Sequence, residues 1–187
     1  MKIVAVISMA LLSCIIASGQ RWLESANAIK ISAGYARDFP GLSGYGVMGE
    51  YSHSLSAFLD GGIAFKHIDM NGYPRSATVK EYTKSNSIDF NLFFVPLLTD
   101  KNILRIGAGY SFSFYKTRRS YPVINTQGIE KITSWPVQDA KGRSSGVIVS
   151  GEYEYLLSSD LSLGIKISLC KAYDRVFYVG PFVAIKL

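Results

Sequence analysis

Eight stretches of this sequence alternate, residue by residue, between two kinds of side chain, and one phase of every stretch is free of charge. Successive side chains of a β-strand point to opposite faces, so the alternation predicts eight strands that each have one apolar face. A Lys or Arg at mid-bilayer costs about 2–4 kcal/mol, so hydrocarbon around that face would keep charges off it. The uncharged faces run from Ile29 to Tyr35, Tyr45 to Tyr51, Leu55 to Phe65, Ile88 to Phe94, Leu104 to Phe114, Val147 to Tyr155, Leu161 to Leu169, and Phe177 to Leu187.

The last stretch, Val176 to Leu187, keeps its apolar alternation through the final residue. A strand in that position must pair on both edges, because an open edge would invite aggregation in water and would leave backbone groups unpaired in lipid. We therefore expect it to close a barrel against the first strand. The predicted fold class is all-β, an eight-stranded antiparallel up-and-down transmembrane β-barrel that spans residues 28–187.

The opposite phase of the stretches is rich in Gly and Ser and carries all the charges, which leaves two interpretations. A secreted soluble ligand-binding β-barrel would put the apolar face inside and the charged face in water. A membrane barrel would reverse the two. Gly weakens a strand unless something approaches it closely, and an eight-stranded barrel has room only for its own side chains. A crowded interior of small residues, with Met48, Phe58, Phe93 and Phe182 as the large ones, favours the membrane.

The predicted connections are short on one side of the barrel and include two long ones on the other. The short links are His53 to Ser54, Thr99 to Asn102 and Ser158 to Asp160, while His67 to Asn86 and Lys116 to Ser144 are long. Outer-membrane barrels have short periplasmic turns and longer external loops. We therefore expect a bacterial outer-membrane location with both mature termini in the periplasm.

The first 19 residues have the features of a secretory signal peptide. Lys2 precedes an apolar run that reaches Ile16 and is followed by Ala17, Ser18 and Gly19. Residues 20–27 would then form a short periplasmic segment. Loss of Lys2 would leave 19 basic and 14 acidic side chains, a net charge of +5. Lipoprotein processing at Cys14 is a second route, and in either case Cys170 has no partner for an internal disulfide.

With these features the chain resembles the small eight-stranded bacterial outer-membrane β-barrel family, the outer membrane protein β-barrel domains related in shape to OmpX and to the OmpA membrane domain. The resemblance covers about Ala28 to Leu187 and rests on the architecture and on the terminal apolar strand. It implies insertion by the barrel-assembly machinery, which reads that strand. It brings a fold and a location but no catalytic motif.

Acidic and basic residues occur together on the predicted inner face. Such charges persist in a narrow lumen only if they pair and form hydrogen bonds. They would form either a neutralised plug or a gated polar pathway for small solutes, and the small bore favours the plug. The predicted lumen network consists of Lys30, Glu50, Asp60, Lys66, Asp89, Arg105, Glu152, Glu154, Lys166, Lys171 and Lys186.

The sequence gives little support for an enzyme, a metal site or a cofactor site. A lipid-modifying outer-membrane enzyme would need His beside Ser and a carboxylate, yet the two histidines are His53, at a predicted periplasmic turn, and His67, in a predicted loop. Gly44 to Gly49 matches G-x-G-x-x-G but lies within an alternating strand, so it is no dinucleotide fingerprint. We expect no catalytic residue, no cofactor and no metal.

The long outer loops are the remaining candidates for a binding role, because they are basic and contain aromatic residues. Such a rim could bind lipopolysaccharide phosphates by charge pairing and stacking, whereas no binding fold for nucleic acid accompanies the charge. We expect a monomeric structural or surface-interaction barrel, with the narrow pore, the enzyme and the soluble barrel as alternatives. The predicted contact residues are Arg118, Arg119, Lys131, Trp135, Lys141 and Arg143.

Overall fold

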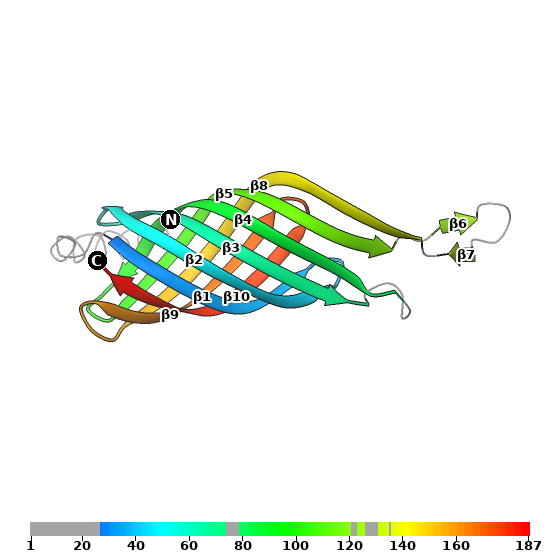
Figure 1. Ribbon diagram of the computed structural model, residues 1–187. Coiled ribbons are helices and arrows are strands. Elements are labelled where there is room, and N and C mark those ends of the chain that lie inside the picture. Colours follow the sequence, from blue (N-terminus) through cyan, green and yellow to red (C-terminus); the bar gives the residue numbers. More distant parts are fainter. Residues whose placement is uncertain (1–26, 74–78, 121–122, 126–130, 135) are drawn as a thin grey trace, which may run out of the picture.

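The computed structural model describes residues 27–73, 79–120, 123–125, 131–134 and 136–187, and eight of its strands form one closed antiparallel barrel (Figure 1). The order around the ring is β1-β10-β9-β8-β5-β4-β3-β2. Short β6 and β7 pair with each other outside the ring. The strands are β1 (Asn27–Asp38), β2 (Ser43–Ser56), β3 (Leu59–Gly72), β4 (Glu81–Leu98), β5 (Asn102–Ser120), β6 (Val123–Asn125), β7 (Lys131–Ser134), β8 (Val137–Leu156), β9 (Leu161–Lys171) and β10 (Arg175–Lys186).

The final strand closes the ring as the sequence predicts. β10 pairs with β1 from Ala28 opposite Lys186 to Asp38 opposite Val176. Both edges of β10 are therefore hydrogen-bonded, since β9 lies on its other side. The described residues contain no helix with the length and apolarity that a membrane crossing requires.

The apolar phase faces outward and the polar phase faces the barrel axis, as predicted. Ile165 and Val183 are 45% and 44% exposed, whereas Lys166 and Glu152 are each only 1% exposed. Many aromatic residues also lie on the exterior, where Tyr45 and Phe65 are among the most exposed. The other exposed aromatic residues of the outward phase include Tyr35, Tyr110, Phe112, Phe114, Phe177, Tyr51, Tyr153 and Tyr155.

The two ends of the barrel differ. At the end that holds Asn27 and Lys186, called here the terminal end, the strands are joined by the short segments 57–58, 99–101 and 157–160. At the opposite end, called the extended end, β5 and β8 run far beyond the ring of shorter strands (Figure 1). The asymmetry agrees with the predicted one, although the turn predicted at His53 to Ser54 lies at residues 57–58.

The predicted long loops are much shorter in the structure, because their residues continue the strands. β3 and β4 remain paired out to Gly72 opposite Glu81, and β5 and β8 out to Ser120 opposite Val137. The alternation persists there with polar residues on both faces, so an apolar phase no longer marks the strand.

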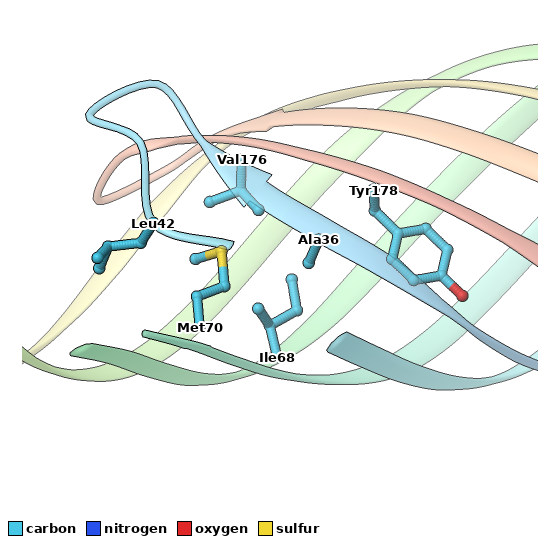
Figure 2. Close-up of a cluster of buried hydrophobic side chains, with 6 residues drawn as sticks. All are labelled: Ala36, Leu42, Ile68, Met70, Val176 and Tyr178. Atoms are coloured by element: carbon cyan, nitrogen blue, oxygen red, sulfur yellow. The ribbon is translucent and has the colours of Figure 1, made fainter. Parts of the chain in front are cut away.

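An apolar cluster fills the lumen near the extended end (Figure 2). It combines side chains of β1, β3 and β10 with Leu42 from the connection between β1 and β2. Tyr178 marks its inner limit, where its hydroxyl lies 2.5 Å from Ser32 Oγ. The cluster consists of Ala36, Leu42, Ile68, Met70, Val176 and Tyr178, with Tyr173 packed against it.

Candidate functional site

The centre of the lumen holds a closed ring of four alternating charges. Lys30 Nζ lies 3.2 Å from Glu50 Oε1 and 2.5 Å from Glu152 Oε2. Lys166 Nζ lies 2.8 Å from Glu152 Oε1 and also contacts Glu50. All four side chains are buried. Lys30 and Glu50 face each other on β1 and β2, as Lys166 and Glu152 do on β9 and β8. The ring therefore joins two strand pairs across the lumen.

Three further ion pairs line the lumen around this ring. Arg105 donates from Nε to Asp60 Oδ2 over 2.7 Å and from Nη1 to Glu154, which also accepts a bond of 2.6 Å from Ser162 Oγ. On another part of the wall, Lys66 donates to Asp89 over 2.8 Å, and Ser111 Oγ donates to the same carboxylate over 2.6 Å. Each of these carboxylates thus has a cation and, in two cases, a hydroxyl.

Aromatic rings fill the space beside the central charges. The ammonium groups of Lys30 and Lys166 lie 5.5 Å and 5.3 Å from the centroid of the Phe93 ring, and Lys30 also lies 5.6 Å from that of Phe182. Phe93, Phe182 and Met48 are buried, as predicted. The prediction for Phe58 is wrong: it lies in the turn between β2 and β3 and is 44% exposed, because β2 continues three residues past His53.

The prediction for Lys171 is also wrong, and Lys186 lies only at the margin of the lumen. Lys171 is exposed on the outward phase of β9, one residue after the inward Cys170. Lys186 is half-buried at the end of β10. The carboxylates of Glu50, Asp60, Asp89, Glu152 and Glu154 therefore face four buried cations, Lys30, Lys66, Arg105 and Lys166, together with Lys186 at the terminal end.

A separate ionic cluster at the extended end centres on Arg119, which was predicted as a surface contact. This prediction is wrong, since Arg119 is buried and points into the mouth of the barrel. Its Nη2 donates to Asp38 over 2.5 Å and to Asp174 over 3.2 Å, and its Nη1 lies 3.8 Å from Glu81. These three carboxylates come from β1, from the connection before β10 and from β4. The guanidinium thus ties together elements from around the whole ring.

Sequence reasoning missed Asp38, Glu81 and Asp174 because they lie where loops were expected. Glu81 lies eight residues before Asp89 on β4, and both belong to the inward-facing phase of that strand. Extending this alternation back from Asp89 could have indicated that Glu81 faces the lumen. Nearby, the Tyr173 ring stacks on Tyr115 with 4.6 Å between centroids, and burial raises the pKa of Tyr173 to about 12.

We expect the change Arg119→Ala to lower the free energy of unfolding by about 2 kcal/mol, because it leaves buried carboxylates without their cation. The matched change is Arg118→Ala, one residue earlier and on the exterior, which should have little effect because exposed ion pairs contribute little. Urea unfolding in lipid vesicles, followed by β-sheet circular dichroism, would measure both. Equal effects of the two changes would contradict this assignment.

The exterior of the extended end carries the other predicted contact residues that the structure describes. Arg118 forms a two-pronged ion pair with Asp139, with distances of 2.8 Å and 2.9 Å, and this hydrogen bonding lowers the pKa of Asp139. Arg143 lies 5.6 Å from the centroid of the Phe114 ring. Lys141 is exposed on β8. The side chain of Lys131 and the whole of Trp135 lie outside the described residues.

The histidines are not arranged for acyl chemistry in the described structure. His53 Nδ1 lies 2.8 Å from Asn27 Oδ1 at the terminal end, and His67 Nδ1 lies 2.8 Å from Asn86 Oδ1 on the exterior. Both of these partners are asparagine amide oxygens. The described residues also contain no group of three or more His, Cys, Asp or Glu that could hold a metal ion.

No protein-family model matches the chain, and no curated protein matches it in sequence. Solved structures do. Neisserial surface protein A, NspA, aligns with a TM-score of 0.60 and 15% identity over 87% of this chain and 98% of its own. The N-terminal β-barrel domain of Pseudomonas aeruginosa OprF gives 0.55 and 10%, over 88% and 100%. The outer membrane protein OprG of Pseudomonas aeruginosa gives 0.54 and 11%, over 87% and 98%.

The chain has the fold of the eight-stranded outer-membrane β-barrels. This confirms the predicted fold class and the resemblance in architecture. Identities of 10–15% carry the fold alone and transfer no activity.

Proposed function

We propose that this protein is a non-conducting, non-enzymatic barrel of the bacterial outer membrane with a structural or surface-interaction role. The observation that carries the proposal is the filled lumen, where four buried charged side chains form ion pairs with one another beside Phe93 and Phe182. A permeant ion would have to displace paired charges from one another, which is costly in a low-dielectric interior. The plug interpretation therefore takes precedence over the narrow pore.

The exterior and the ends of the barrel support the location and orientation. The outward phase exposes large apolar side chains on all eight strands of the ring, a surface that would aggregate in water but suits hydrocarbon. Short turns on the side of the termini match the periplasmic side of known barrels. In this proposal the signal peptide over residues 1–19 directs export, the assembly machinery inserts a monomer, and the extended end faces outside.

The extended end would carry the interaction role. It rises beyond the ring as the paired β5 and β8, and its exterior bears Arg118, Arg143, Lys116 and Lys141. A basic surface of this kind suits an anionic neighbour such as lipopolysaccharide, because charge pairing with phosphate is strong and tolerates varied geometry.

Reconstitution tests this function directly. We expect the full mature chain to migrate differently on gels before and after heating, to require detergent for extraction, and to give no steady conductance in planar bilayers. The double variant Phe93→Ala/Phe182→Ala removes bulk beside the charge ring and should conduct more than the wild type.

An exterior pair provides the matched control for that variant. Phe90→Ala/Phe94→Ala also removes two phenyl rings, but from the lipid-facing side of β4. This control variant should leave conductance unchanged. Steady ohmic channels in the wild-type protein would contradict the plug. Solubility of the folded chain without detergent would contradict the membrane location.

A further inference from the structure

Three lysines lie side by side on the exterior of the extended end. Lys84 on β4 faces Lys116 on β5, and Lys116 in turn faces Lys141 on β8. All three are exposed and belong to the outward phase of their strands. Neighbouring strands are about 4.8 Å apart, so three ammonium groups on flexible stems can reach one small anion. We call Lys84, Lys116 and Lys141 the lysine row.

The lysine row is only partly neutralised by the described residues around it. Like charges directly opposite one another destabilise a strand pair, yet the row places three in succession. Lys84 has Asp69 at 2.7 Å, but among the described residues no ion pair is formed by Lys116 or Lys141. Asp139, the nearest acid on β8, is engaged by both prongs of Arg118.

The charges around the row sum to a clear excess. Its immediate neighbourhood includes the cations Arg118 and Arg143 and the anions Asp69 and Asp139. Five positive charges, the three lysines and the two arginines, therefore stand against two negative ones, a net of +3. Among the described residues, this surface therefore has an excess of positive charge that suits an anionic partner.

The row also borders the lipid-facing band. On β5, Lys116 lies two residues after Phe114 and therefore on the same face of the strand. Phe112 and Tyr110 lie on that face as well. Opposite Phe114 on β8 lies Arg143, whose guanidinium is close to the same ring. Long basic side chains at such a boundary reach the headgroup level of the membrane while their stems cover apolar surface.

We propose that the lysine row, with Arg143, binds phosphate groups of a glycolipid in the outer leaflet, of the type carried by the lipid A part of lipopolysaccharide. This inference rests on the proposed location and orientation and names the partner of the basic surface. The occupant is a lipid because the basic residues lie directly beside Phe112 and Phe114, which face the acyl chains. One lipid molecule can therefore contact both the aromatic and the basic residues. A phosphomonoester suits the row because it offers several acceptor oxygens and up to two charges at one point.

The test compares the double variant Lys116→Gln/Lys141→Gln with the control Lys80→Gln/Lys101→Gln. Both remove two exposed lysines, but Lys80 lies before β4 and Lys101 lies at the terminal end. Native mass spectrometry of the full mature chain, released from maltoside micelles, would count bound lipid A. With about a tenfold effect on affinity for each 1.4 kcal/mol and about 1 kcal/mol per lysine, the row variant should bind roughly 30-fold more weakly, and the control like wild type.

A second comparison uses lipid A from which both phosphates have been removed. The wild-type chain should bind it far more weakly than the bisphosphorylated form. Equal losses in the row variant and the control, or unchanged binding in both, would overturn the lysine row as the site. Equal affinity for the dephosphorylated lipid would overturn phosphate as the ligand.

A different observation would contradict the proposed function. If the wild-type chain needs no detergent and shows no heat-dependent gel shift, then the membrane location is wrong whatever the lipid data show. The same gel shift, recorded for each variant, verifies that a loss of lipid binding reflects the missing lysines and not a misfolded barrel.

Discussion

Replacing Glu152 with alanine is expected to lower the free energy of unfolding by about 3–5 kcal/mol, the usual cost of leaving a buried charge without its partner. Glu152 contacts Lys30 at 2.5 Å and Lys166 at 2.8 Å, and its Oε2 is 4.0 Å from Arg105. After the change, two buried ammonium groups share the single carboxylate of Glu50. The lumen then carries an uncompensated positive charge.

A double variant separates this charge imbalance from the mere loss of contacts. Glu152→Ala/Lys166→Met removes one charge of each sign and leaves Lys30 paired with Glu50 at 3.2 Å. Replacing both members of a buried pair is often nearly neutral, so the double variant should recover more than half of the loss. Asp139→Ala, an exposed acid on the same strand, should have little effect.

Urea titration of the barrel in lipid vesicles, with the heat-dependent gel band as the readout, would give the three values. A cost below about 1 kcal/mol for Glu152→Ala would mean that water replaces the carboxylate. In that case the lumen is hydrated and the argument for a closed plug loses its basis.

Much of this lumen could be predicted from the sequence. The period of two assigns Lys30, Glu50, Glu152 and Lys166 to the inner face, and the structure buries all four. The antiparallel order further makes each Lys a cross-strand neighbour of one Glu. The sequence does not reveal that these two Lys–Glu pairs contact each other across the lumen. That contact depends on how the barrel closes and on the stagger of its strands, which decide which residues of opposite strands lie at the same level along the barrel axis.

The extended end shows the opposite situation. There the apolar phase stops while the strands continue, so the sequence signal for β-structure disappears before the structure does. Arg118 and Arg119 therefore looked like neighbours in one solvated loop. In a strand they face opposite sides, and Arg119 becomes a buried tie between Asp38 and Asp174 while Arg118 remains outside with Asp139. A continuing alternation from Asp89 to Glu81 was the only hint.

Replacing Gly164 with alanine is expected to cost at least about 3 kcal/mol, or to prevent assembly, because the lumen at this position has no room for even one added carbon. Gly164 lies on the inward phase of β9, between Phe182 on β10 and Glu154 on β8. A Cβ at this position would lie 2.3 Å from Phe182 Cζ and 2.4 Å from the Tyr153 carbonyl oxygen. The ring could turn aside, but the carbonyl belongs to the paired backbone and cannot.

Gly49 provides the matched substitution, because it also lies within a strand but faces outward with no atom within 4 Å of an added Cβ. Gly49→Ala should leave stability unchanged or raise it by up to about 1 kcal/mol, since glycine within a strand carries an entropic cost. Phe182→Leu combined with Gly164→Ala should restore part of the loss and no more, because the clash with the Tyr153 carbonyl remains. Equal changes in the free energy of unfolding for Gly49→Ala and Gly164→Ala in urea titrations would show that the lumen is not close-packed around Gly164. The contact with the Tyr153 carbonyl would then contribute nothing to the cost of the substitution.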